Sequence, residues 1–93
     1  IKINKRWFFP DSISREKRII VEFLGDFWHC NPKIYLEDYF HPRLKLTAKE
    51  IWKIDNNRIN KFQNEGYKVI IVWEKDFKED KNNTIKQIEK LLI

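Results

Sequence analysis

The chain has no methionine and only one cysteine, two glycines and three prolines. One cysteine excludes an internal disulfide and cannot by itself make a thiolate metal site, which fits a reducing compartment. No apolar run approaches the roughly 20 residues of a membrane helix, and the chain does not open on a signal-peptide pattern. We therefore expect a soluble protein that stays in the cytoplasm and has no membrane partner.

The sequence also lacks internal repeats, low-complexity tracts and any sign of a second domain. Its 93 residues are near the lower limit for a chain that buries its own core, but an apolar share of 42% is enough for a packed interior. Because the first residue is Ile and not Met, we expect residues 1–93 to be a single domain from a longer protein, with an N-terminal element missing.

Positive charge exceeds negative charge in this chain. Nineteen Lys and Arg residues against fourteen Asp and Glu give a net charge of +5, and four Trp, three Tyr and seven Phe accompany them. Basic residues mixed with aromatic residues are typical of nucleic-acid binders. The alternative is a lysine-rich solvated surface without a nucleic-acid partner.

Two apolar stretches in the first part of the chain predict a hairpin. Residues 3–11 predict an aromatic strand that ends at Pro10, and residues 12–18 predict a polar turn. Residues 19–24 are almost continuously apolar, which predicts a strand buried on both faces. Residues 31–46 show no clean periodicity, and so long a loop in a small domain favours a functional role.

The second part of the chain predicts a helix, a strand and a helix. A capping box at residues 47–50 opens the first helix and Gly66 is placed to end it. Its inward positions are Ile51, Ile54, Ile59 and Phe62. Residues 67–73 predict a central strand, residues 74–81 a charged turn, and a second capping box at residues 84–87 a final helix. The expected fold is α/β, with a small mixed sheet, a parallel crossover and flanking helices.

Acidic residues at the ends of the first two strands are candidate metal ligands. Magnesium ions bind oxygen atoms, usually one or two carboxylates plus water and substrate. Asp11 and Glu22 are the natural pair if the two strands are adjacent. The alternatives are a turn acid for Asp11 and a salt bridge, for example to Arg18, for Glu22; a buried carboxylate needs one partner or the other.

Three further side chains could take part in proton transfer or support it. Imidazole titrates near neutral pH, so His29 suits a general base or acid, although a lone histidine is more often a structural hydrogen-bonding group. Asp26 is either a turn residue beside Gly25 or a partner of the site. Asp55 shares the buried face of the predicted helix, as a possible supporting acid or as the ion-pair partner of Arg58 or a lysine.

Two blocks with the right separation carry a family resemblance. The run E-F-L-G-D-F-W-H at residues 22–29 and the run G-Y-K-V-I-I-V-W-E at residues 66–74 are similar to those of very-short-patch repair endonucleases and of phage homing endonucleases of the E-D-x-H-D type. Both belong to the PD-(D/E)xK nuclease superfamily. The resemblance covers residues 7–77 and implies a restriction-endonuclease-like fold. It also implies that the protein acts in the cytoplasm of a bacterial or phage-infected cell.

The resemblance implies a role for several residues. Asp11 would be the metal-binding acid of the first strand and His29 the catalytic histidine. The backbone carbonyl at or beside Phe23 would bind metal, as would Glu22 in the phage type. Phe27 and Trp28 match aromatic residues that wedge into DNA, where such side chains unstack bases; their alternative role is core packing.

The chain departs from the family pattern in three ways. Leu24 replaces the usual lysine two residues after the strand acid, so His29 or Asp26 must handle the proton. Cys30 near His29 is too little for the structural zinc of the repair enzymes, so we expect none. The N-terminal helix with its further acid is absent from these residues, and Asp55 is a possible substitute.

These observations predict a Mg²⁺-dependent DNA endonuclease, with Mn²⁺ as a possible substitute, acting on double-stranded DNA as a monomer or transient dimer. Asp11 and Glu22 would hold metal, His29 would transfer the proton and Asp26 would orient His29 or a metal-bound water. Besides Lys2 and Lys5, the expected phosphate contacts are Lys33, Arg43, Lys45 and Lys49. The alternative is a catalytically silent DNA-binding or protein-interaction domain with the same fold.

Overall fold

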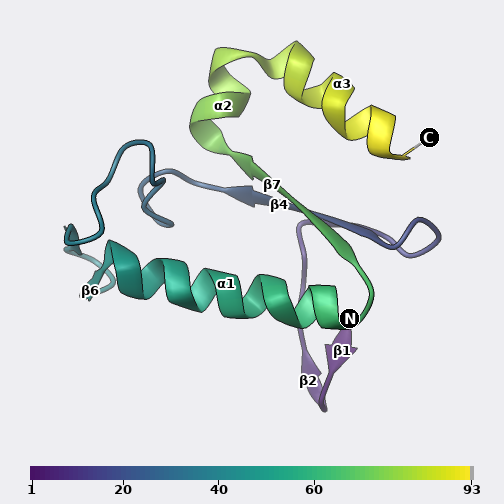
Figure 1. Cartoon of the computed structure of the whole chain (residues 1–93), viewed down its shortest axis with the longest axis horizontal. Coiled ribbons are helices and arrows are strands. Elements are labelled where there is room, and N and C mark those ends of the chain that lie inside the picture. Colours follow the sequence, from purple (N-terminus) through teal and green to yellow (C-terminus); the bar gives the residue numbers. More distant parts are fainter. Residues whose placement is uncertain (93) are drawn as a thin grey trace.

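The computed structural model describes residues 1–92 as a small mixed α/β domain. A three-stranded sheet lies between α1 on one face and α2 with α3 on the other (Figure 1). The elements in chain order are β1 (Lys2–Ile3), β2 (Arg6–Trp7), β3 (Ser12–Ser14), β4 (Ile19–Leu24), β5 (Phe40–His41), β6 (Leu46–Thr47), α1 (Ala48–Asn64), β7 (Lys68–Trp73), α2 (Glu74–Glu79) and α3 (Lys81–Leu92). Within residues 1–92 no helix is long and apolar enough to cross a membrane.

The main sheet has the strand order β3-β4-β7. β3 runs antiparallel to β4, and β4 runs parallel to β7, with Glu22 opposite Ile71. The predicted parallel crossover through a helix is therefore confirmed. The prediction that residues 67–73 form the central strand was wrong, because β4 takes the middle position and β7 lies at an edge of the sheet as described for residues 1–92.

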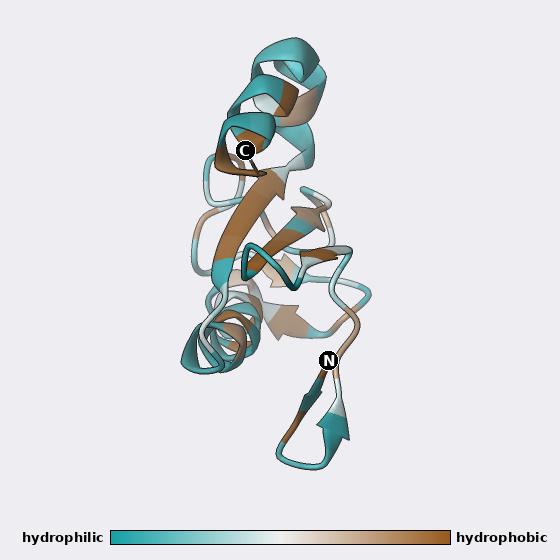
Figure 2. Cartoon of the chain, turned by 90° about the vertical axis from the view of Figure 1, so that its right-hand side faces the viewer, coloured by the Kyte–Doolittle hydropathy of each residue, from teal (hydrophilic) through white to brown (hydrophobic). Residues whose placement is uncertain are grey.

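Alternation along β4 divides the core into two layers. Ile20 is fully buried on the α1 side with Phe62 and Tyr67. Ile19 and Val21 face the opposite layer, which includes side chains of β7, α2 and α3. The brown strands between teal helix surfaces in Figure 2 show this arrangement. Burial of β4 on both faces, predicted for residues 19–24 from their continuous apolar character, is confirmed for residues 19–22, whereas Phe23 is 48% exposed.

Helix α1 begins and ends as its sequence predicts. The Thr47 hydroxyl accepts a hydrogen bond from the Glu50 amide (3.2 Å), and the Glu50 carboxylate accepts one from the Thr47 amide (3.1 Å). Gly66 follows the helix with φ of +89°, a conformation that favours glycine. Ile54, predicted to point inward, is 57% exposed. A pitch of 3.6 residues turns it about 60° from Ile51, away from the packed side.

The N-terminal prediction of one strand over residues 3–11 was wrong. Asn4 and Lys5 both have positive φ and form a tight turn, so β1 and β2 make a separate hairpin. Residues 12–14, predicted as part of a turn, form β3 and pair with β4. Pro10 lies between the two units and has no amide hydrogen to continue a ladder. The structure thus places Asp11 immediately before β3.

The C-terminal helices also differ from prediction. Residues 74–79, predicted as a charged turn, form α2. Helix α3 starts at Lys81, ahead of the capping box predicted at residues 84–87. Asp80 provides the cap, because its carboxylate accepts a hydrogen bond from the Asn83 amide (3.1 Å).

Candidate active site

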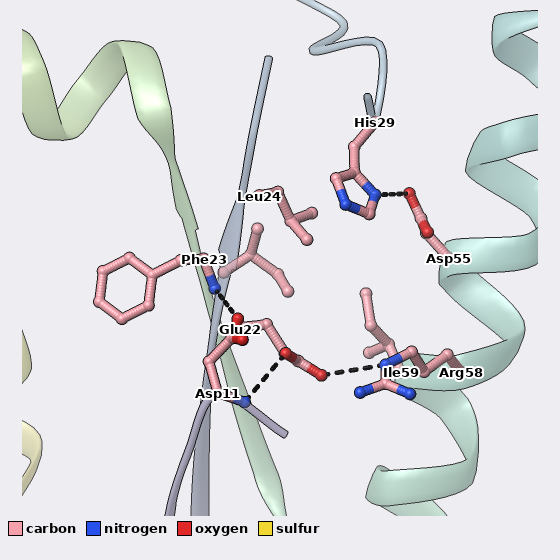
Figure 3. A pocket seen from close by; sticks show the side chains of 9 residues that line it. Asp11, Glu22, Phe23, Leu24, His29, Asp55, Arg58 and Ile59 are labelled. Carbon is pink, nitrogen blue, oxygen red and sulfur yellow. Dashed lines mark hydrogen bonds and ion pairs between the residues drawn. The ribbon is translucent and has the colours of Figure 1, made fainter. Parts of the chain in front are cut away.

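A pocket of about 240 Å³ opens between β4 and α1. Its walls combine charged side chains from separate parts of the chain with an apolar floor (Figure 3). The lining residues are Asp11, Glu22, Phe23, Leu24, His29, Asp55, Arg58, Ile59 and Ile71. Four of the residues singled out from the sequence for chemistry are therefore neighbours: Asp11, Glu22, His29 and Asp55.

Asp11 and Glu22 meet because Asp11 precedes Ser12, and Ser12 is paired with Val21, the residue before Glu22. The Asp11 amide donates to the Glu22 carboxylate (3.4 Å), and the Asp11 carboxylate accepts from the Phe23 amide (2.8 Å). The amide and carbonyl of a strand residue point to the same side, so the Phe23 carbonyl also faces the Asp11 edge. The Phe23 side chain points to the other face of the sheet, edge-on to Phe77.

Glu22 is 6% exposed and has a charged partner. Arg58 of α1 donates from Nε to its carboxylate (3.1 Å) and from a second nitrogen to the Phe9 carbonyl (3.2 Å). Burial raises the pKa of Glu22, and the nearby Arg58 guanidinium opposes that rise. The partner suggested from sequence, Arg18, instead stacks on Tyr67, 4.2 Å from the ring centre.

His29 and Asp55 form a hydrogen-bonded pair across the pocket. His29 lies in the turn after β4, where its amide donates to the Gly25 carbonyl (3.1 Å). Its Nδ1 lies 2.9 Å from an oxygen of Asp55. This bond is the main cause that raises the pKa of His29, against the opposing effect of burial. The sequence left Asp55 as either a supporting acid or the ion-pair partner of Arg58 or a lysine. In the structure Asp55 bonds to His29, and Arg58 pairs with Glu22 instead.

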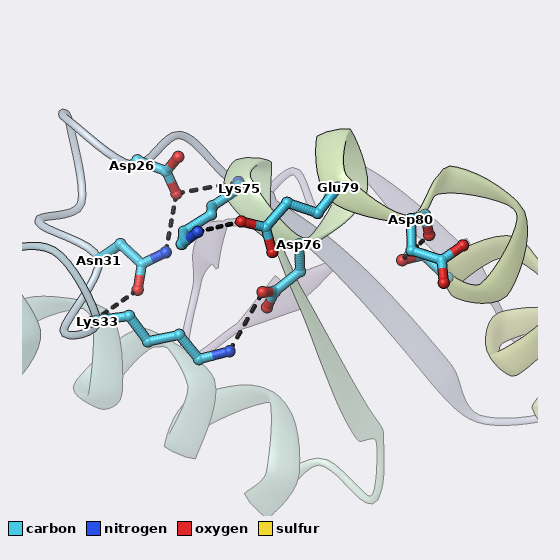
Figure 4. Close-up of polar contacts among 8 residues, drawn as sticks. Asp26, Asn31, Lys33, Lys75, Asp76, Glu79 and Asp80 are labelled. Carbon is cyan, nitrogen blue, oxygen red and sulfur yellow. Dashed lines mark hydrogen bonds and ion pairs between the residues drawn. The ribbon is translucent and has the colours of Figure 1, made fainter.

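Asp26 lies apart from this pocket. Its carboxylate accepts hydrogen bonds from the Asn31 side chain (2.9 Å) and the Lys75 amide (3.2 Å), and its own amide donates to Glu74 (3.1 Å). Figure 4 shows how these contacts join the loop after β4 to the start of α2. The prediction that Asp26 orients His29 is therefore corrected: nearness in sequence suggested Asp26, but the fold gives that position to Asp55.

The aromatic residues Phe27 and Trp28 lie over a histidine that sequence reasoning missed. His41 is fully buried, with ring centres 4.2 Å from Phe27 and 5.4 Å from Trp28. Its Nδ1 accepts from the Arg43 and Leu44 amides (3.2 and 3.0 Å). Trp28 nevertheless remains 52% exposed. Phe27 thus packs against His41, in agreement with its alternative role in core packing, while part of the Trp28 ring remains accessible to solvent.

The predicted phosphate contacts other than Lys2 and Lys5 fall into two groups. Arg43, Lys45 and Lys49 are exposed around β5, β6 and the start of α1. Lys33 forms an ion pair with Asp76 (3.2 Å), which ties it to α2 (Figure 4). Arg58 is the charged pocket residue that sequence reasoning gave no role of its own. Its spacing of three residues from Asp55, on the same side of a helix, was the available signal.

Two carboxylates, and not a larger cluster, define the metal-binding capacity of the pocket. Within residues 1–92 there is no group of three or more His, Cys, Asp and Glu side chains placed to hold a metal ion. Asp11 and Glu22 nevertheless provide the oxygen donors that Mg²⁺ takes in sites completed by water and substrate. Protein-family models, curated proteins and solved structures give no match to the chain.

Proposed function

We propose that this chain is the catalytic domain of a Mg²⁺-dependent DNA endonuclease with a restriction-endonuclease-like fold. The supporting observation is the pocket itself, in which two carboxylates and a histidine–aspartate pair from distant parts of the chain share one cavity. Hydrolysis of a phosphodiester needs charge neutralisation at the phosphate and a base for the attacking water. The pocket supplies candidates for both.

The residues of this pocket fit a magnesium ion by the chemistry of their donor atoms. Asp11 and Glu22, with the Phe23 carbonyl on the same edge of β4, would hold it. When bound, Mg²⁺ or Mn²⁺ would neutralise charge on the scissile phosphate. A cation at this point also opposes the effect of burial on Glu22, whose pKa is raised.

His29 is positioned to move the proton. With Asp55 accepting from the Nδ1 proton, the Nε2 atom keeps its lone pair, and Figure 3 shows the ring pointing into the pocket. Nε2 takes a proton from water as the water oxygen bonds to phosphorus. The P–O bond to the leaving sugar oxygen breaks, and that oxygen takes a proton from solvent. Asp55 stabilises the imidazolium until His29 releases its proton to solvent.

The surroundings of the pocket suit a DNA substrate. Arg58 places a guanidinium at the cavity wall, and Arg43, Lys45 and Lys49 add exposed positive charge. Such contacts give affinity without sequence choice. The exposed ring of Trp28 is available to stack on or wedge between bases.

One observation favours a second candidate function, a silent DNA-binding domain. Glu22 already has a cationic partner in Arg58, so the fold places a positive charge beside this carboxylate without a metal. A domain that retained only binding would show the same ion pair. The two candidates differ in whether DNA is cut.

A supercoiled-plasmid assay separates the two candidates. The chain is incubated with Mg²⁺, with Mn²⁺ and with a chelator, beside H29A, E22A and the control E89A, which removes an exposed carboxylate on α3. We expect metal-dependent relaxation that E89A retains. H29A should lose about 10²- to 10⁴-fold in rate, the range for general acid–base groups. Plasmid binding without any metal-dependent cleavage would refute the endonuclease and support the silent domain.

A further inference from the structure

The hairpin of β1 and β2 is anchored by one of its faces. Ile3 is 5% exposed and packs with Phe62 and Tyr67, and the Phe8 ring meets Phe62 edge-on at 5.9 Å. Hydrogen bonds between Ile1 and Phe8 in both directions (2.8 and 3.0 Å) extend the ladder. The hairpin is therefore held in place by packing, close to the C-terminal end of α1 (Figure 1).

The other face and the tip of the hairpin carry positive charge and an open aromatic ring. Lys2 and Trp7 are directly opposite each other, and the Lys2 ammonium lies 5.8 Å from the centre of the Trp7 ring. Trp7 is 59% exposed. Lys5 at the tip is also exposed, whereas Arg6 is opposite Ile3 on the anchored face, with its guanidinium 5.7 Å from the centre of the Phe8 ring. The first ten residues contain three basic and no acidic side chains, so no local acid neutralises this face.

The hairpin leads straight into the candidate active site. Trp7 and Asp11 are four residues apart, which limits their separation to about 14 Å. Between them, the Phe9 carbonyl accepts a hydrogen bond from Arg58, the residue that also binds Glu22. The position of the hairpin relative to the pocket is thereby fixed by a side chain of the pocket itself.

We propose that the exposed face of the β1–β2 hairpin binds the backbone of duplex DNA on one flank of the cleaved phosphate. Lys2 and Lys5 would pair with phosphates and Trp7 would pack against the sugar edge. This inference rests on the proposed function, which places the cleaved phosphate in the pocket. It adds that the chain contacts the DNA backbone on one particular side of that phosphate. A Cα–Cα separation of at most about 14 Å corresponds to about four base pairs at 3.4 Å each, so the contacted flank should begin within a few base pairs of the cut.

The test measures DNA binding in chelator, where no cleavage occurs. Fluorescence anisotropy on a linear duplex over a range of salt compares the wild-type chain with K2Q/K5Q. The control K86Q/K90Q removes the same charge from exposed positions on α3, across the sheet. A second variant, K5G, removes the tip charge and tolerates the φ of +67° at that position.

We expect K2Q/K5Q to bind about 10- to 100-fold more weakly near 0.1 M salt, with the salt slope reduced by about 1.8 for two lost phosphate contacts. K5G, which removes one charge, should reduce the salt slope by about half as much as K2Q/K5Q does. Hydroxyl-radical protection on one flank should disappear with K2Q/K5Q and persist with K86Q/K90Q. Equal affinity and slope in the two double variants would overturn the inference, as would a wild-type chain that binds no duplex. Tight binding through the hairpin in chelator, together with no nicking in the plasmid assay with Mg²⁺ or Mn²⁺, would refute the endonuclease alone.

Discussion

At the scale of single residues, Asp55 is the main cause of the shift in the pKa of His29. The hydrogen bond between them raises the pKa of His29. A general base acts in its neutral form, so the acid limb of the wild-type pH–rate profile should have its midpoint above 6.5, the ordinary histidine value. In D55N this midpoint should move to lower pH, while the plateau rate falls because the tautomer is no longer fixed. Single-turnover nicking measured from pH 5 to 9 gives both quantities.

Stability provides an independent reading of the same pair. A histidine whose folded pKa is raised stabilises the fold fully below its unfolded value, and this stability is lost as pH rises through the folded pKa. The wild-type chain should therefore exceed D55N in unfolding free energy most clearly below pH 6.5 and progressively less above it. N57D, on the outer side of α1, serves as the control. A D55N profile that coincides with wild type would show that Asp55 does not act on His29.

Glu22 should be a residue at which stability and function oppose each other. Its folded pKa is raised by burial, so the ionised form is less favourable in the fold than in the unfolded chain. E22Q should therefore melt above the wild-type chain at pH 7 in chelator. The difference should shrink as pH falls through the folded pKa and vanish below 4.5, the unfolded value.

Magnesium should reverse the order of the two melting temperatures, so that the wild-type chain melts above E22Q. The ion binds only the carboxylate form, so millimolar Mg²⁺ should raise the melting temperature of the wild-type chain and leave E22Q unchanged. Thermal melts with and without the ion make the comparison. Equal Mg²⁺ effects on both chains would place the metal elsewhere or nowhere.

At the scale of elements, two sequences of the capping-box type, residues 47–50 and residues 84–87, have different roles. Thr47 caps α1 in a complete capping box, whereas Thr84 lies inside α3 and donates to the Asp80 carbonyl (3.0 Å). T47A should cost about 1 kcal/mol, the typical value for such a cap. For a chain of this size that lowers the melting temperature by about 4–8 °C. T84A should lower it by less than half as much, and circular dichroism melts compare the two. A larger loss in T84A would show that the motif also governs α3.

The elements that the sequence predicts well are those whose signals are local. Helix α1 has its cap and its closing glycine in the sequence, and β4 and β7 are short apolar runs. The hairpin of β1 and β2 escaped prediction because its turn uses Asn4 and Lys5, not glycine, at positive φ. Helix α2 escaped because its charged sequence gave no apolar face; the N-terminal contact from Asp26 to Lys75 comes from a loop 49 residues earlier.

The candidate site shows the same division. Sequence reasoning reached Asp11, Glu22 and His29, because strand ends and rare residue types mark them. It gave Asp26, and not Asp55, the task of orienting His29, because the actual pairing depends on where α1 crosses the sheet. Nor could it give Glu22 its partner Arg58, which is 36 residues away. Pairings across a crossover follow from tertiary packing and not from spacing.

At the scale of the whole molecule, one chain offers one pocket that combines Asp11, Glu22 and His29. A single site can hydrolyse one phosphodiester in each encounter. The two strands of a duplex run in opposite directions, so a second cut needs a second chain or a second binding event. We therefore expect nicked circles to accumulate well before linear DNA when supercoiled plasmid is in excess.

The rates at which nicked and linear DNA form should depend differently on enzyme concentration. The rate of nicking should rise in proportion to the concentration of the chain, whereas linear DNA should appear after a lag and with a steeper dependence. Quantified gel time courses at several concentrations give both orders, with H29A as the blank. Linear product that forms without a nicked intermediate and in first order would require two sites in one particle. The active species would then be a preformed dimer, with the two pockets placed on opposite strands.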